Sequence, residues 1–126
     1  MSTSPQQPFS AEPRPRLLVV DDDVIVRDMA ARSLRHAGFL VDEAAGGEAA
    51  LQAFHRAPFD LVLMDVVMPG IDGFETCRRL RAQPHGRHVP VVMLTGLDDV
   101  ASIDQAHRAG ATDFITKPIN WPLLIQ

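Results

Sequence analysis

The sequence predicts an α/β domain in which a parallel β-sheet is covered by helices on both faces. Short apolar runs, RLLVV, FDLVLM and VPVVML, alternate with longer segments in which apolar residues recur at helical spacing. The runs are nearly continuous in valine, leucine and methionine, as expected for strands that are buried on both sides. Regular alternation of such strands with helices favours an α/β over an α+β arrangement.

Composition limits the number of domains and the kinds of partner. A chain of 126 residues fits one domain with a real hydrophobic core, which we place at residues 16–126. Residues 1–15 hold four of the ten prolines and no apolar period, so a disordered leader is predicted there. The net charge of −4 argues against general binding to nucleic acid or to a membrane surface. With one cysteine, no export signal and no long apolar run, a cytoplasmic location is expected.

The first apolar run is expected to form a strand, followed by a helix. This helix is predicted to begin after Asp23, a residue type that caps the open amides of a first turn. It is predicted to end near Gly38, because glycine readily adopts the left-handed conformation at a helix end. Its apolar spacing places Ile25, Met29 and Leu34 toward the core.

The middle of the chain is predicted to contain two further strands and two helices. A strand over 39–44 leads to a helix over 47–57, which Pro58 terminates. The third strand, FDLVLMD, is followed by MPGIDG, a loop that is dense in turn residues. Asp72 is placed to begin the next helix, and the segment PHGRH ends it.

The last third of the chain is predicted to add two strands and one complete helix. The fourth strand, VPVVMLT, precedes a helix from about 98 to 109, and the fifth strand is TDFITK. A fifth helix is expected to begin at Asn120 and has only about one turn before the sequence stops. Because so short a helix is not stable alone, the chain is expected to be the N-terminal part of a longer protein.

Reactive side chains stand directly after the predicted strands. Asp21 and Asp22 follow the first strand, Asp65 the third, Thr95 ends the fourth, and Lys117 ends the fifth. In an open parallel sheet, ligands bind beyond the carboxyl ends of the strands, so these residues are expected to converge. Any one of the aspartates alone is more simply a helix cap or a solvated charge. Three carboxylates that lie close together, however, repel one another unless a cation is present.

The chemistry of this edge favours magnesium and phosphoryl transfer. Mg²⁺ prefers oxygen ligands and is commonly held by one or two carboxylates, whereas no twelve-residue calcium loop is present. An ionised carboxylate needs no general base to attack phosphorus, because alignment and charge shielding suffice. Lys117 can supply part of that shielding, and the Thr95 hydroxyl can donate to a phosphoryl oxygen.

The segments LLVVDDD, LVLMDVVMPGIDGFE, VVMLTG and GATDFITKPIN resemble the receiver domain of bacterial two-component response regulators. The resemblance implies a flavodoxin-like fold with strand order 2-1-3-4-5. It implies that Asp65 becomes the aspartyl phosphate, and that Asp22 and Asp65 bind Mg²⁺ directly. Asp21 is implied to act through a water molecule, and the backbone carbonyl of Val67 to complete the ligands. It also implies a cis Lys117–Pro118 bond.

The same resemblance implies a switch and a set of partners. Thr95 and Phe114 would rearrange on phosphorylation, although a plain core position remains the alternative for Phe114. A histidine kinase or a phosphotransfer protein would be the donor. The altered surface would be the fourth helix, the fifth strand and the start of the fifth helix. That surface would act on a second receiver or on an output domain after residue 126. A diguanylate cyclase is one candidate output and a DNA-binding domain is another, and a stand-alone regulator is the alternative.

Three other classes are weighed against this interpretation. A small-molecule binder of flavodoxin type needs a phosphate loop after the first strand, where this chain has three acids. A magnesium-dependent phosphohydrolase usually carries its aspartate nucleophile after the first strand and needs a substrate pocket for which this length leaves little room. A degenerate receiver that acts only through interactions is disfavoured because all five site residue types are intact.

Overall fold

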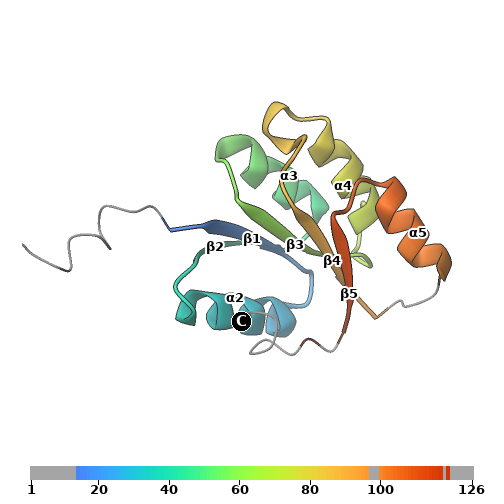
Figure 1. Cartoon of the computed structure of the whole chain (residues 1–126). Helices are drawn as coiled ribbons and strands as arrows, with labels where there is room; N and C mark the ends of the chain where they lie inside the picture. The colour runs from blue at the N-terminus through green and yellow to red at the C-terminus, as the bar shows by residue number, and fades with distance from the viewer. Residues whose placement is uncertain (1–13, 97–99, 118, 120–126) are drawn as a thin grey trace, which may run out of the picture.

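The computed structural model describes residues 14–96, 100–117 and 119. Within these residues, five strands alternate with four α-helices and one 3₁₀ turn (Figure 1). In chain order the elements are β1 Arg16–Val20, α2 Val24–His36, β2 Leu40–Ala44, α3 Gly47–Arg56, β3 Leu61–Asp65, α4 Gly73–Arg81, η1 Pro84–Gly86, β4 Val91–Thr95, α5 Val100–Arg108 and β5 Asp113–Thr116.

The five strands form a single parallel sheet in the order β2-β1-β3-β4-β5. The predicted α/β class and the strand order 2-1-3-4-5 are therefore confirmed. The register pairs Asp65 with Leu94 and Thr95 with Thr116, so β3, β4 and β5 end at the same edge. Because all the strands are parallel, the residues that follow them meet along that edge.

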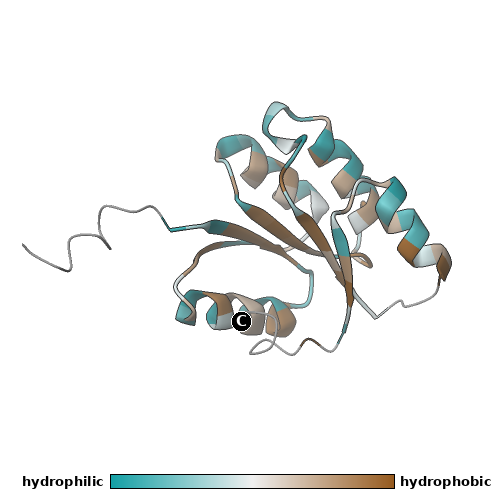
Figure 2. Cartoon of the chain, viewed as in Figure 1, coloured by the Kyte–Doolittle hydropathy of each residue, from teal (hydrophilic) through white to brown (hydrophobic). Residues whose placement is uncertain are grey.

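Helices cover both faces of the sheet, as Figure 1 shows, with α2 on one side and α3, α4 and α5 on the other. Two apolar cores result, one on each face, and alternate residues of the strands point into one or the other. Figure 2 shows the strands as largely hydrophobic. The larger core lies under α3, α4 and α5 and includes Leu18, Phe54, Met64, Leu80 and Met93. The smaller core lies under α2 and includes Val19, Ala30, Leu34, Leu63 and Leu94.

Two aspartates cap the N-termini of helices that begin near the carboxyl edge of the sheet. The Asp23 side chain accepts from the amides of Ile25 and Val26, and Asp72 accepts from the amide of Glu75. Both caps were predicted from the sequence. Gly38 follows α2 with a φ of +103°, a conformation that glycine adopts without strain and that ends the helix where predicted.

The predicted core side of α2 is partly wrong. Ile25 and Met29 are 67% and 57% exposed, and only Leu34 of the three expected residues is buried. Ala30 and Ala31 complete the buried stripe instead. Since α2 carries two neighbouring apolar stripes, and each residue turns the helix by about 100°, spacing alone did not decide which stripe faces the sheet.

Several predictions concern residues beyond those that the structure describes. They are the leader as far as residue 13, the state of the bond between Lys117 and Pro118, and the helix expected from Asn120. Arg14 and Pro15 are described, and the carbonyl of Pro15 accepts from the amide of Leu40 at 3.0 Å. None of the described helices has the length and apolar character that a membrane crossing requires.

Candidate metal and phosphoacceptor site

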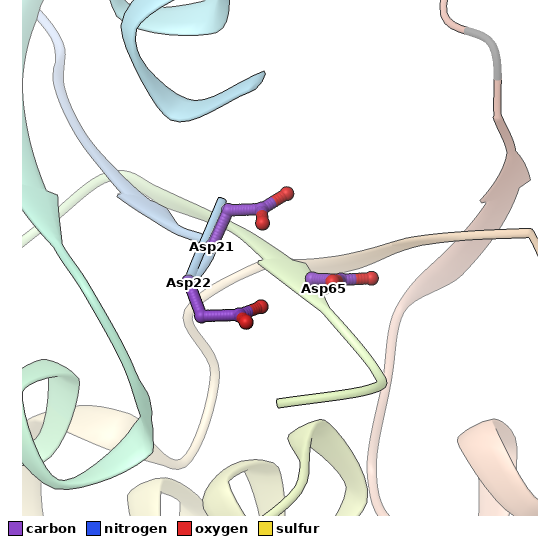
Figure 3. A group of neighbouring side chains, drawn as sticks. All are labelled: Asp21, Asp22 and Asp65. Atoms are coloured by element: carbon purple, nitrogen blue, oxygen red, sulfur yellow. The ribbon is translucent and has the colours of Figure 1, made fainter. Parts of the chain in front are cut away.

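Three aspartates gather where β1 and β3 end, as Figure 3 shows. One carboxylate oxygen from each of Asp21, Asp22 and Asp65 lies within 4.8 Å of the other two. Asp21 and Asp65 are buried, whereas Asp22 is exposed. Buried carboxylates in such proximity are unfavourable without a compensating charge, so this cluster has the character of a cation site.

Lys117 follows β5 and reaches two of the three carboxylates. Its Nζ lies 3.1 Å from Asp21 Oδ2 and 3.5 Å from Asp65 Oδ1. Its backbone amide donates to the carbonyl of Thr95 at 2.7 Å, which fixes the lysine at the end of the sheet. The side chain is 26% exposed, so the ammonium group bridges two buried acids and still meets solvent.

The pKa of Asp65 is raised, first because burial disfavours its ionised form and second because the charge of Asp21 repels it. Lys117 and the amide of Val66 act in the opposite direction without reversing the shift. For Lys117, burial lowers the pKa, but the hydrogen bond to Asp21 and the charge of Asp65 outweigh it, so the net pKa is raised. Lys117 therefore stays protonated at neutral pH, and the cluster keeps an excess of negative charge.

The local backbone holds the carboxylates in place. The amide of Val66 donates to Asp65 Oδ1 at 2.9 Å, and the amide of Asp23 donates to Asp21 Oδ1 at 2.9 Å. The N-terminus of α4 approaches so closely that a Cβ on Gly73 would collide with the carbonyl oxygen of Asp65. A glycine is required at that position, and the sequence alone did not single it out.

The other predicted site residues lie at or near the same edge. Thr95 is buried at the end of β4, beside the end of β3. Phe114 is partly buried and packs against the larger core. Val67 is 62% exposed, two residues beyond Asp65, and its carbonyl oxygen remains a predicted metal ligand.

Two features beside the cluster were not predicted. Arg27, in the first turns of α2, donates from Nη1 to the carbonyl of Asp21 at 2.8 Å. A hollow of about 420 Å³ lies between α2 and the sheet, where apolar residues such as Met29, Leu94 and Ile119 meet the polar groups of Arg27 and Lys117. No sequence pattern predicts either feature, because each depends on how α2 packs on the sheet.

The donor set suits a hard divalent cation. Three carboxylates against one ammonium leave net negative charge, and carboxylate oxygens are the ligands that Mg²⁺ prefers. The five strands with this acidic edge define a flavodoxin-like domain whose reactive groups lie at the carboxyl ends of the strands.

Comparisons with known proteins support the resemblance to receiver domains. Residues 17–126 match the response regulator receiver domain family. The response regulator PleD of Caulobacter vibrioides is 44% identical over 106 residues, which are 83% of this chain and 23% of PleD. Other curated relatives are named as transcriptional regulators, and the chain spans less than half the length of those it matches.

Solved structures show the same likeness. The chemotaxis protein CheY4 of Vibrio cholerae has a TM-score of 0.87 and 34% identity, over 90% of this chain and 94% of that one. The receiver domain of the sensor histidine kinase PA1611 of Pseudomonas aeruginosa has a TM-score of 0.82 and 30% identity, over 89% and 92%. That receiver domain was solved with a magnesium ion coordinated in its active site cleft. This chain belongs to the response regulator receiver domain family, whose members are signalling domains.

Proposed function

We propose that this domain accepts a phosphoryl group on Asp65 from a histidine kinase or a phosphotransfer protein. The observation that carries the proposal is the meeting of Asp21, Asp22 and Asp65 with the ammonium of Lys117 at one edge of the sheet. Membership of the receiver family supports it. Under this proposal the domain catalyses its own phosphorylation and dephosphorylation and turns over no separate substrate.

In the transfer step, one Oδ of Asp65 attacks the phosphorus of a phosphohistidine. An O–P bond forms, the P–N bond breaks, and its electron pair returns to the imidazole nitrogen of the donor. Asp65 attacks as the carboxylate, and at neutral pH it requires no base. The ammonium of Lys117 lies 3.5 Å from Asp65 and is placed to offset the charge on the transferred phosphoryl oxygens. The hydroxyl of Thr95 would donate a hydrogen bond to one of these oxygens.

We propose Mg²⁺ as the cofactor, held by Asp22, Asp65 and the carbonyl of Val67, with Asp21 acting through a water molecule. When bound, Mg²⁺ neutralises the clustered carboxylates and the charge on the phosphoryl oxygens. The oxygen separations of at most 4.8 Å fit one shared cation. The magnesium in the PA1611 receiver domain is a parallel from a relative at 30% identity.

The switch would run from Thr95 and Phe114 to the face formed by α5 and β5. Most α5 side chains are exposed, and Val100 is 83% exposed, so this face is available to a partner. We propose that phosphorylation changes its pairing with a second receiver or with an output domain after residue 126. A diguanylate cyclase and a DNA-binding domain are the two candidate output domains. We propose that the phosphoryl transfer takes place in the cytoplasm.

The donor would dock beside α2. Val24, Ile25 and Met29 expose apolar surface on this helix, next to the loop that carries Asp22. Exposed apolar residues that adjoin a reactive group mark a contact surface. Ile25→Asp is therefore expected to slow transfer from a protein donor while leaving phosphorylation by acetyl phosphate unchanged. Equal slowing with both donors would contradict docking on this helix.

The central test is the mass of the intact protein after incubation with acetyl phosphate, with and without Mg²⁺. We expect a single phosphoryl adduct that requires both Mg²⁺ and Asp65, and none on Asp65→Asn. Asp104→Asn is the matched control, because Asp104 is an exposed acid that pairs with Arg108 on α5, away from the cluster.

The opposite result is equally informative. If no adduct forms, and beryllofluoride, a mimic of the phosphoryl group, does not bind in the presence of Mg²⁺, the domain is an interaction module that works without phosphorylation. An adduct that persists in Asp65→Asn would assign the acceptor to another residue.

A further inference from the structure

We propose that Arg27 is a positioning residue for the cation site. It holds the backbone of the loop between β1 and α2 so that Asp21 and Asp22 present their carboxylates together. The inference rests on the proposed function, because the cation in question is the Mg²⁺ of that site. It adds a basic residue of α2 to a site otherwise built from residues that follow strands.

Arg27 makes a direct and shielded contact with the acidic loop. Its Nη1 donates to the carbonyl oxygen of Asp21 at 2.8 Å, and the arginine side chain is only 17% exposed. That carbonyl belongs to the peptide group between Asp21 and Asp22, so the bond fixes the peptide plane from which the Asp22 side chain projects. A hydrogen bond from a charged donor is stronger than one between neutral groups, and partial burial shields it from water.

The rest of the loop is held by other groups. The amide of Asp21 donates to the carbonyl of Ala44 at 3.1 Å, and its carboxylate accepts from the amide of Asp23. These bonds tie the loop to β2 and to the start of α2. The carbonyl of Asp21 takes part in neither bond, and Arg27 is the hydrogen-bond partner found for it within the described residues.

Arg27 is itself oriented by a second partner. Its Nε lies 3.3 Å from Glu43 Oε1 on β2, so two different edges of the guanidinium contact two different partners. Lysine has one compact ammonium at the end of a flexible chain and does not reproduce this planar fork. Arg27→Lys is therefore expected to restore the charge but only part of the positioning.

Arg35 provides a matched control on the same helix. It also pairs with Glu43, through Nη1 and Oε2 at 3.2 Å, and it also donates to a backbone carbonyl, that of Val41 at 2.8 Å. Its carbonyl partner lies within β2 and not in the acidic loop. Arg27→Ala and Arg35→Ala thus remove similar bonds between α2 and β2, and only the first removes a bond to the cation site.

The experiment is calorimetric titration of the protein with Mg²⁺, on wild type, Arg27→Ala, Arg27→Lys and Arg35→Ala, with urea unfolding of each variant in EDTA. Loss of a residue that orients metal ligands typically weakens affinity by about 10-fold to 100-fold. We expect Mg²⁺ affinity to fall about 10-fold in Arg27→Ala, to fall less in Arg27→Lys, and to stay within about twofold of wild type in Arg35→Ala.

The outcomes separate this inference from the proposed function. If wild type does not bind Mg²⁺, the proposed cation site is wrong and the role of Arg27 falls with it. If wild type binds Mg²⁺ and the two alanine variants bind it with the same affinity as each other, Arg27 has only a structural role and the inference is overturned. Should Arg27→Ala fail to fold, Arg27→Lys decides, because an affinity equal to that of wild type at matched stability would also overturn it.

Discussion

Replacing Asp65 by asparagine is expected to stabilise the metal-free protein. Asparagine keeps the shape of the side chain and an oxygen that can accept from the amide of Val66, but it removes one negative charge from the cluster. Most substitutions at a buried position destabilise a protein. Here the native residue is the unfavourable one without a cation, because a buried carboxylate lies beside two others.

The magnitude follows from the separations of the charges. At an effective dielectric constant of about 20, two like charges at the upper limit of 4.8 Å repel by about 3.5 kcal/mol, and Asp65 has two neighbours within that distance. The attraction to Lys117 at 3.5 Å is worth about 4.7 kcal/mol on the same scale. The difference is about 2 kcal/mol of net repulsion, which salt and the exposure of Asp22 reduce. We expect Asp65→Asn to raise the free energy of unfolding by about 1–2 kcal/mol at low ionic strength.

The raised pKa of Asp65 also predicts how the stability difference between wild type and Asp65→Asn changes with pH. Because the pKa of Asp65 is raised on folding, the stability contributed by its protonated form is complete below the ordinary value of 3.8. That stability is lost as the pH rises through the raised pKa of the folded state. Asparagine resembles the protonated form at every pH. Its advantage over wild type is therefore largest at neutral pH and shrinks as the pH falls toward 3.8.

The assay is urea unfolding at pH 7 in EDTA, repeated with excess Mg²⁺. Mg²⁺ should stabilise wild type more than Asp65→Asn, so that the difference between them narrows or reverses. Asp104→Asn is the control outside the cluster and should be neutral or slightly destabilising, because its exposed pair with Arg108 is worth little. If Asp65→Asn is no more stable than wild type in EDTA, the carboxylates do not repel one another as argued.

Three further predictions concern the packing of glycines, the buried thiol and a surface ion pair. Gly86→Ala should lower the free energy of unfolding by about 1–3 kcal/mol, since its Cβ would collide with the carbonyl oxygen of Leu80. Gly96→Ala, which has open space around its Cβ, should change the free energy of unfolding little. Equal effects of the two substitutions in urea unfolding would contradict this explanation. The Cys77 thiol is buried and its pKa is raised by burial, so a thiol reagent at pH 8 should label it only in urea, and rapid native labelling would refute its burial. The pKa of Glu75 is lowered by hydrogen bonds from Arg79 and Arg78, so the stability that its charge contributes is present above pH 4.5 and is lost as the pH falls through the lowered pKa. The difference in melting temperature between wild type and Glu75→Gln should therefore vanish in acid. A difference that stays constant with pH would refute the charged interaction.

Local signals in the sequence were sufficient to predict most of the fold. The caps Asp23 and Asp72, the glycine at position 38 and the apolar runs placed the helices and strands close to their observed bounds. The strand order came from the resemblance to receiver domains, because periodicity does not specify which strands are neighbours. The orientation of α2 was not predictable in the same way, since its two apolar stripes lie side by side and packing selected the one with the small residues Ala30 and Ala31.

The acidic cluster was predictable for a geometric reason. In a parallel sheet the residues that follow the strands lie along one edge, so Asp21 and Asp65, which follow the neighbouring strands β1 and β3, come close once the order of the strands is known, and the long side chain of Lys117 reaches them from the end of β5. The contact between Arg27 and the carbonyl of Asp21 has no such rule behind it. It depends on the rotation of α2 and on a long side chain that reaches a backbone atom, and neither leaves a mark in the residue pattern.

The charges at this edge also suggest why Lys117 suits a switch. Its ammonium is shared between Asp21 and Asp65, with the shorter contact to Asp21. Under the proposed function, phosphorylation would replace the single charge of Asp65 by a group carrying about −1.5 to −2 and several acceptor oxygens. The balance of attraction would then move from Asp21 toward Asp65. Because the amide of Lys117 is bonded to the carbonyl of Thr95, a displaced lysine would pull on the ends of β4 and β5 together.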